Sequence, residues 1–312
     1  MRPLSPKSQS LAEFGEVVWP DQADEPILSK AVRDSMTNWL TEIWAREDLE
    51  SVGLKPRQKA LFTGPPGTGK TTLAHHMAAR LKLPMVIVRS DKLIDAYVGV
   101  TDQNIGRLFD LASQSSPHVI FFDEFDTLAT QRRKAAHGAE DARNSMVNTM
   151  LQRVEGFDGF VIAASNNADD IDTALWRRFD IQVRLDLPGH RERELILARY
   201  LSPYVLSTEA LDLFAGAFNE ASPALMRQFC EGLKREIVVG PKVGWDMTKE
   251  ATIDRLLSAV EPHPSLPRPR LWIRRGQDLA IAELQWPLQV DEKARNAIAK
   301  RAKARRVEGE AA

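Results

Sequence analysis

The stretch GPPGTGKT, residues 64–71, constrains the fold of this chain more than any other part of the sequence. It fits the pattern G-x-x-x-x-G-K-[ST], whose glycines let main-chain N–H groups converge on phosphate oxygens. A short apolar run precedes it, and a run rich in Ala, Leu, Met and His follows it. This context predicts a strand, a phosphate-binding loop and a helix with its N-terminus toward the anion. The alternative interpretation is a glycine turn that binds nothing.

Two side chains of this loop have expected chemical tasks. The Lys70 ammonium is expected to reach the β- and γ-phosphates of a nucleotide, and the Thr71 hydroxyl is expected to bind Mg²⁺. The residues expected to surround the phosphates are Gly64, Pro65, Pro66, Gly67, Thr68, Gly69, Lys70, Thr71 and Thr72.

A second motif, HVIFFDEFD at residues 118–126, ends an apolar run with carboxylates. A strand with this sequence would place Asp123 and Glu124 at its carboxyl end, facing the glycine loop. Asp123 is expected to hold Mg²⁺ directly or through water, because carboxylate oxygens are ligands that this ion prefers. Glu124 is expected to orient and polarise an attacking water as a general base. The alternative is an exposed acidic strand end without a catalytic role.

Short apolar runs separated by helical patterns recur through the first part of the chain. Runs that are apolar throughout are typical of a parallel sheet covered on both faces, so the predicted fold class is α/β. Strands are predicted at residues 60–62, 84–90, 118–123, 160–166 and 181–188. Helical patterns without a strand signal follow Pro188, at residues 190–201, 208–218 and 223–237.

These patterns predict four parts of the chain. They are an N-terminal extension with a helix at residues 1–55, a large α/β domain at 56–188, a small helical lid domain at 189–260, and a proline-rich linker with a basic tail at 261–312. The stretch EPHPSLPRPR carries four prolines in ten residues, which predicts an extended linker.

Composition narrows the class of protein. The 42 basic and 43 acidic residues nearly balance, so bulk charge indicates no polyanionic partner. Cys230 is the one cysteine, which excludes an internal disulfide and is unusual for a secreted chain. The first residues show no apolar signal-peptide core, and the longest apolar runs are far shorter than a membrane span. We expect a soluble, cytoplasmic protein without a membrane partner.

Four motifs in order, GPPGTGKT, FFDEFD, VIAASN and ALWRRFD, resemble those of the AAA+ ATPases. The resemblance is to the AAA subgroup, in particular to compact bacterial or phage ATPases with an RRFD segment, and it covers roughly residues 59–235. It implies a P-loop NTPase module with a parallel sheet flanked by helices, followed by a helical lid. It also implies that ATP and Mg²⁺ are the ligands of the first two motifs, known in this family as Walker A and Walker B.

The same resemblance implies further nucleotide contacts. Asn166 ends a strand that resembles the sensor 1 strand beside the γ-phosphate, although an asparagine pair there also suits a turn. Arg177 and Arg178 lie in the segment that resembles the arginine-finger region, where the usual string has Pro–Gly between the two arginines. Arg227 lies where sensor 2 is found. For these arginines the alternative is an ordinary surface ion pair.

Tyr97, Val98 and Gly99 resemble the aromatic–hydrophobic–glycine pattern of the family's first pore loop. An aromatic ring can grip an extended peptide without reading its sequence, because stacking and apolar contact ask little of side-chain identity. The polar residues around Tyr97 favour an exposed loop, and the alternative is a tyrosine in the core.

The resemblance implies a homo-oligomeric ring, expected to be a hexamer, that hydrolyses the phosphoanhydride bond of ATP at subunit interfaces. Its expected output is remodelling, unfolding or translocation of a protein substrate through a central pore, with a separately encoded protease as an expected partner. One alternative is a nucleic-acid loader or remodeller that uses the basic tail at residues 293–306, although such tails are more often solvated ends. Another is a switch that assembles with nucleotide.

Overall fold

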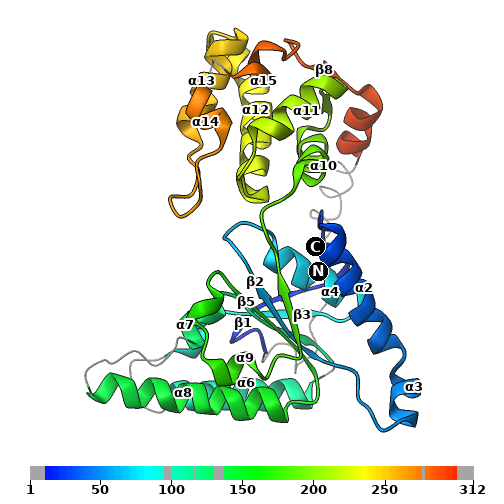
Figure 1. Cartoon of the computed structure of the whole chain (residues 1–312), viewed down its shortest axis with the longest axis vertical. Helices are drawn as coiled ribbons and strands as arrows, with labels where there is room; N and C mark the ends of the chain where they lie inside the picture. The colour runs from blue at the N-terminus through cyan, green and yellow to red at the C-terminus, as the bar shows by residue number, and fades with distance from the viewer. Residues whose placement is uncertain (1–10, 95–99, 116, 130–136, 276–277, 301–312) are drawn as a thin grey trace. The chain divides into compact units, whose positions relative to one another are not determined.

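The chain forms two compact units, each with its own hydrophobic core. The structure is a computed structural model and describes residues 11–94, 100–115, 117–129, 137–275 and 278–300 (Figure 1). The first unit comprises residues 2–26 and 30–186, and the second comprises residues 27–29 and 187–312.

A six-stranded sheet is the centre of the first unit, and it contains all five predicted strands. The strands lie in the order β1-β3-β4-β5-β2-β6, and each neighbouring pair is parallel except β1 with β3. Their bounds are β1 Gly15–Val18, β2 Lys59–Thr63, β3 Met85–Val88, β4 Val119–Phe122, β5 Phe160–Ser165 and β6 Ile181–Arg184. The predicted α/β class is therefore confirmed, as a mixed sheet that is mostly parallel.

Strand β1 was not expected, because residues 1–25 read as a polar extension broken by prolines. It pairs antiparallel with β3, in a register that sets Gly15 opposite Val88. A Cβ atom on Gly15 would lie 1.9 Å from the Ile87 carbonyl oxygen, so only glycine fits there without a shift of the strands. Four residues are too few to show an alternating pattern, and their partner is far away in the sequence.

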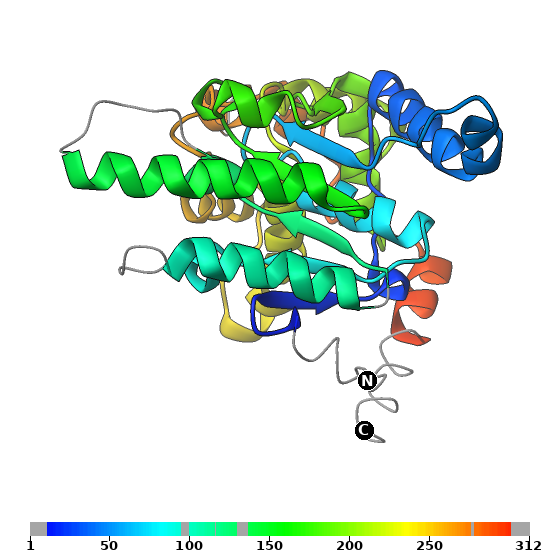
Figure 2. The same ribbon diagram turned by 90° about the horizontal axis from the view of Figure 1, so that it is seen from below.

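Helices bury both faces of the sheet. The helices of the first unit are α2 Lys30–Trp44, α3 Arg46–Ser51, α4 Lys70–Arg80, α5 Ser90–Leu93, α6 Val100–Gln114, α7 Phe125–Ala129, α8 His137–Gly156 and α9 Thr173–Trp176, with the 3₁₀ turns η1 Pro20–Gln22 and η2 Ala168–Asp170. Helices α6 and α8 lie side by side over one face, and α4 covers the other (Figures 1 and 2).

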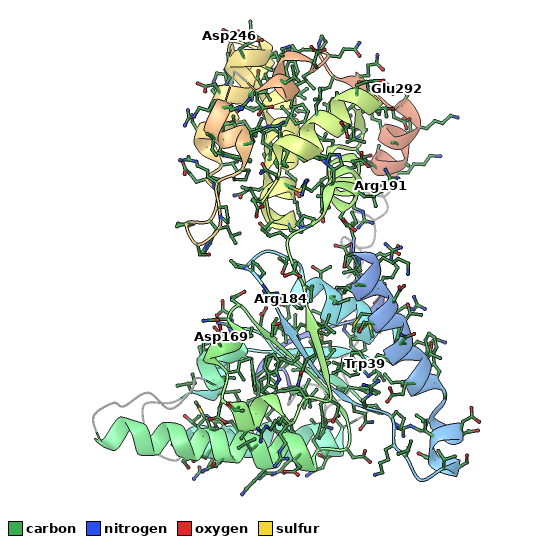
Figure 3. The ribbon with its side chains drawn as sticks, in the orientation of Figure 1. Trp39, Asp169, Arg184, Arg191, Asp246 and Glu292 are labelled. Atoms are coloured by element: carbon green, nitrogen blue, oxygen red, sulfur yellow. The ribbon has the colours of Figure 1, made fainter. Side chains whose placement is uncertain are left out.

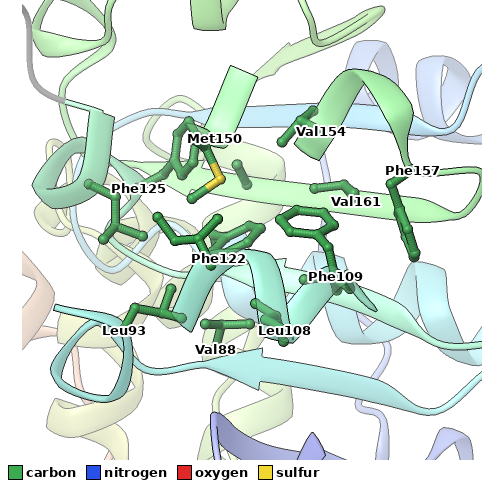
Figure 4. Close-up of a cluster of buried hydrophobic side chains, with 14 of the residues drawn as sticks. Val88, Leu93, Leu108, Phe109, Phe122, Phe125, Met150, Val154, Phe157 and Val161 are labelled. Carbon is green, nitrogen blue, oxygen red and sulfur yellow. The ribbon is translucent and has the colours of Figure 1, made fainter. Parts of the chain in front are cut away.

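The core beneath α6 and α8 is built from alternate residues of the strands. Phe122 of β4 and Val161 of β5 pack with Phe109 of α6 and Val154 of α8 (Figure 4). On the other face, alternate strand residues are also fully buried, because α4 presents its apolar side there. The buried residues of this second face include Phe62, Phe121 and Ile162 with Leu73 and Met77 of α4. Parallel strands covered on both faces explain the continuous apolar runs.

Helix α2 joins the sheet at the β6 edge. Its Trp39 side chain is buried, and the indole Nε1 donates to the Arg57 carbonyl oxygen at 2.9 Å (Figure 3). Arg57 also donates to the carboxylate of Glu42, and this contact holds the pKa of Glu42 below its ordinary value. The chain is thereby anchored just before β2 and the glycine loop.

The second unit is mainly helical. Its elements are α10 His190–Leu201, β7 Tyr204–Val205, α11 Thr208–Ala217, α12 Pro223–Val243, α13 Lys249–Ala259, α14 Arg270–Arg274, α15 Leu279–Ala282 and β8 Gln289–Val290. The three predicted helical segments are α10, α11 and α12. The residues after the proline-rich stretch also contribute to this core. The Trp272 ring lies with its centroid 5.6 Å from that of Phe218 and 6.0 Å from that of Phe229, and its Nε1 donates to the Val260 carbonyl oxygen at 2.7 Å.

Trp272 lies beyond residues 189–260, the predicted lid domain, but its side chain is part of the core of the second unit. A proline-rich composition does not indicate whether the short apolar segment after it packs against another part of the chain. The predicted domain bounds stay a proposal.

None of the helices in the described part of the chain combines the length and apolar character that a bilayer crossing requires.

Candidate active site

The order of the strands brings the predicted site residues to one edge of the sheet. The carboxyl ends of parallel strands lie at the same edge, and β5 lies between β4 and β2. Asn166, which follows β5, is therefore set between Asp123, which follows β4, and the glycine loop, which follows β2. This edge is where open α/β sheets place their ligands.

Lys70 is held at the centre of this edge. Its side chain is buried at the start of α4, and its Nζ donates to the carbonyl oxygens of Gly64 at 2.8 Å and Pro65 at 2.9 Å. The same Nζ donates to Asn166 Oδ1 at 2.8 Å. Burial lowers the pKa of Lys70, and the nearby carboxylates of Asp123 and Asp126 partly oppose this. The loop, the sensor 1 position and the acidic strand end thus surround one ammonium group.

Thr71 and Asp123 form a pair of hard oxygen donors. The Thr71 hydroxyl donates to Asp123 Oδ2 at 2.8 Å, and Asp123 Oδ1 accepts from the Glu124 main-chain N–H at 3.0 Å. A hydroxyl and a carboxylate side by side are the donor set that Mg²⁺ takes beside a nucleotide. These residues fit the predicted metal.

The loop backbone fits a bound chain of phosphates. Gly64, Gly67 and Gly69 have φ values of 140°, 75° and 95°, which residues with side chains rarely adopt. A Cβ on Gly64 would lie 2.0 Å from the Leu185 carbonyl oxygen, whereas the space around Gly69 is open. The N-cap residue of α4 is Gly69, which has no side chain to accept from the first N–H groups of the helix. A bound anion can take that role.

Glu124 is exposed and has an unusual backbone. Its φ is 49°, in the left-handed region, which costs a residue with a side chain about 1–2 kcal/mol. The Asp123 carboxylate accepts a hydrogen bond from the Glu124 main-chain N–H, and the Thr127 hydroxyl donates to the Glu124 carbonyl oxygen. The sequence did not single out Thr127, because a threonine in the first turn of a helix has many ordinary uses.

The two arginines lie at the opposite edge of the sheet. Arg177 and Arg178 come between α9 and the amino end of β6, whereas Lys70 and Asp123 lie at the carboxyl ends. Both are exposed and line a cavity of about 440 Å³ together with Lys59, the first residue of β2. Arg178 Nη2 lies 3.2 Å from Oε2 of Glu155, near the end of α8. Neither arginine therefore lies at the edge formed by the carboxyl ends of the strands, where the glycine loop of the same chain lies.

Two further predictions concern residues elsewhere in the chain. Tyr97, Val98 and Gly99 lie outside the described residues. Arg227 belongs to the second unit, where its Nε donates to Glu231 Oε1 at 2.8 Å and its guanidinium lies 5.5 Å from the centroid of the Tyr200 ring. Its role as a nucleotide contact stays a prediction.

A mostly parallel sheet with a glycine loop after one strand and an acidic pair after another defines a P-loop nucleotide-binding protein. Residues 60–187 match the family described as "ATPase family associated with various cellular activities (AAA)". An uncharacterized AAA family ATPase of Sinorhizobium fredii, y4kL, is 38% identical over 191 residues, which are 60% of this chain and 57% of that protein. The ATP-dependent zinc metalloprotease FtsH of Buchnera aphidicola is 34% identical over 209 residues, 65% of this chain and 33% of the protease.

Among solved structures, the FIGL-1 AAA domain matches with a TM-score of 0.65 at 20% sequence identity. The match covers 84% of this chain and 91% of that chain, and at this identity it shows the fold alone. This chain spans little more than half the length of y4kL and a third of the length of FtsH. Residues 60–187 thus form a domain of the AAA family, which confirms for this part of the chain the family resemblance read from the sequence.

Proposed function

We propose that copies of this chain form a ring, expected to be a hexamer, that hydrolyses ATP at the interfaces between subunits. One observation carries the proposal: Lys70, Asp123 and Asn166 gather at one edge of the sheet, and Arg177 and Arg178 lie at the other. A phosphate bound by the glycine loop can therefore be approached by these arginines only from another copy of the chain. An arginine suits this task because its guanidinium stays charged and binds phosphate through two N–H groups.

Within one chain, each residue has a separate task in hydrolysis. The loop N–H groups and Lys70 bind the β- and γ-phosphates, and Asn166 orients the γ-phosphate and the water. The oxygen of the water attacks the γ-phosphorus while Glu124 accepts a proton from that water. The bond from the γ-phosphorus to the oxygen that bridges it to the β-phosphorus breaks. The products are ADP and inorganic phosphate. Thr71 and Asp123 would hold Mg²⁺, which supplies charge neutralisation at the phosphate oxygens.

A mixing experiment tests whether the active site is shared between chains. The first protein carries both Arg177→Ala and Arg178→Ala, and the second carries Glu124→Gln. Each protein alone should bind ATP and turn it over poorly. When the two proteins are mixed, the first supplies Glu124 and the second supplies both arginines, so some interfaces become complete. Phosphate release is expected to recover to at least about tenfold above either protein alone, since an arginine finger contributes about 10³–10⁵-fold to turnover.

Native mass with and without ATP–Mg²⁺ is the control for this experiment, because recovery requires mixed oligomers. Mixed oligomers without any recovery of phosphate release would show that each chain contains a complete site. The arginine assignment would then be wrong.

The mechanical output is part of the same proposal. We place the protein in the cytoplasm, with an unfolded protein segment as substrate and a separately encoded protease as a partner. The support is the AAA+ class, the pattern Tyr97-Val98-Gly99 beyond α5, and the FtsH relative, whose name is that of an ATP-dependent protease.

Tyr97→Ala is expected to abolish unfolding of a tagged fluorescent protein while basal ATP turnover stays within about twofold of wild type. The physical reason is that the aromatic ring grips the substrate and does not touch the nucleotide. Tyr97→Phe keeps the ring and is the matched control. Unfolding by Tyr97→Ala at the wild-type rate would contradict the pore assignment.

A further inference from the structure

Thr127 makes a contact that the chemistry above does not use. Its hydroxyl Oγ1 donates to the Glu124 carbonyl oxygen at 2.8 Å, and its main-chain N–H donates to the same oxygen at 2.9 Å. On the other side of Glu124, Asp123 Oδ1 accepts from the main-chain N–H at 3.0 Å. Both peptide groups that flank the Cα atom of Glu124 are therefore held by hydrogen bonds.

These contacts matter because of the backbone conformation at Glu124. Its φ of 49° is one that a residue with a Cβ atom adopts only when its surroundings impose it. Rotation about φ would redirect the Cα–Cβ bond and with it the carboxylate. The side chain is exposed, so packing does little to fix it. The direction of this carboxylate thus depends on the hydrogen bonds to its main chain.

A second hydroxyl, that of Ser90, orients the hydroxyl of Thr127. Ser90 is the first residue of α5, and its Oγ lies 3.2 Å from Thr127 Oγ1. A hydroxyl has one proton, and that of Thr127 is directed at the Glu124 carbonyl, so Ser90 is the donor and Thr127 accepts. The hydrogen bonds therefore run from the Ser90 hydroxyl to the Thr127 hydroxyl, and from that hydroxyl to the Glu124 carbonyl oxygen. Helix α5 ends at Leu93, a few residues before the predicted substrate loop in the sequence.

We propose that Thr127 is a positioning residue for Glu124, and that Ser90 orients the Thr127 hydroxyl. Thr127 keeps the Glu124 backbone in the left-handed conformation that aims its carboxylate at the attacking water. This deepens the proposed function, since it rests on Glu124 being the general base. It also gives the segment before the substrate loop a physical link to that base.

The first test compares three replacements in the full chain by steady-state phosphate release. Thr127→Val keeps the shape and removes the hydroxyl, and it is expected to lower kcat at least about tenfold with KM for ATP within about twofold, because misplaced catalytic groups cost rate more than binding. Thr127→Ser keeps the hydroxyl and should stay within about twofold of the wild-type kcat. Ser90→Ala should lower kcat by a smaller factor, about threefold. A Thr127→Val kcat within twofold of wild type would overturn the proposal.

Thr41→Val is the matched control. The Thr41 hydroxyl donates to the Thr37 carbonyl oxygen at 2.9 Å on α2, a similar contact far along the chain from the site. Its kcat should equal that of wild type. An equal loss in Thr41→Val and Thr127→Val would assign the effect to helix stability and overturn the positioning role.

A double replacement separates action through Glu124 from action elsewhere. If Thr127 works through Glu124, adding Thr127→Val to Glu124→Gln should change the residual turnover by less than about twofold, since coupled residues are not additive. A further tenfold loss in the Glu124→Gln background would overturn the proposal.

A structural measurement keeps the proposal testable apart from turnover. Absence of ATP hydrolysis by the wild-type protein would count against the proposed function. The positioning role would then be judged on a crystal structure of Thr127→Val. Glu124 outside the left-handed region is the expected result, and Glu124 with its φ unchanged would overturn the proposal.

Discussion

Glu124→Gln is expected to lower ATP turnover at least about a hundredfold while ATP affinity stays within about threefold of wild type. A carboxamide keeps the size of the side chain and cannot take a proton from water, and general-base catalysis contributes about 10²–10⁴-fold. Steady-state phosphate release measures the loss, and titration with a fluorescent ATP analogue measures the affinity. The neighbouring Asp123, Thr71 and Lys70 keep their contacts in this variant, which is why binding should survive.

Glu50→Gln, at an exposed position on α3, is the matched control and should leave both quantities unchanged. Turnover by Glu124→Gln within about threefold of wild type would show that another group activates the water. Joint loss of affinity and turnover would instead indicate that Glu124 serves in binding.

Lys70→Met is expected to weaken ATP binding at least about tenfold and to abolish measurable turnover. The ammonium is buried among the Gly64 and Pro65 carbonyls and Asn166, and hydrogen bonds to charged groups contribute about 1.5–3 kcal/mol each. Methionine has similar length without charge, so the loss reports on the ammonium. Equilibrium titration with the fluorescent ATP analogue measures it.

Lys59→Met supplies an informative control, because Lys59 is a second buried lysine in the same unit. Its Nζ donates to the carbonyl oxygens of Phe157 at 2.5 Å and Gly159 at 3.0 Å, and burial lowers its pKa as it does that of Lys70. It lies at the amino end of β2, away from the glycine loop. Lys59→Met should lower the free energy of unfolding by about 1–3 kcal/mol and leave ATP affinity unchanged. Similar losses of affinity in both variants would assign the effect of Lys70→Met to stability.

Much of the first unit could be predicted because its signals are local. A buried parallel strand is apolar on both faces, so β2 to β5 appear as apolar runs bounded by polar residues. The edge strand β6 differs, because buried Ile181 and Val183 alternate with exposed Gln182 and Arg184. The glycine loop and the acidic pair are short patterns whose residue types follow from binding phosphate and Mg²⁺. Helices α10 to α12 of the second unit show the repeat of an amphipathic helix.

Other features depend on partners far away in the sequence and left no local signal. Strand β1 is recognisable only through its pairing with β3, and Trp272 only through its contact with Phe218 and Phe229. The ion pair of Arg178 with Glu155 joins the segment after α9 to the end of α8. The left-handed backbone of Glu124 and its hydrogen bond from Thr127 are local, but they depend on backbone angles that residue types do not specify.

The sequence by itself determined the chemistry available to this protein: a loop able to wrap phosphate, a helix N-terminus behind it, oxygen donors for a cation, a carboxylate base and two adjacent arginines. These follow from residue types at short spacings, where backbone geometry leaves few alternatives. Only the tertiary structure decided which of them meet. The strand order sets Asn166 between Asp123 and Lys70. The parallel direction of β6 puts Arg177 and Arg178, which precede this strand, at the opposite edge. That order depends on pairing between distant segments, which short sequence patterns do not encode.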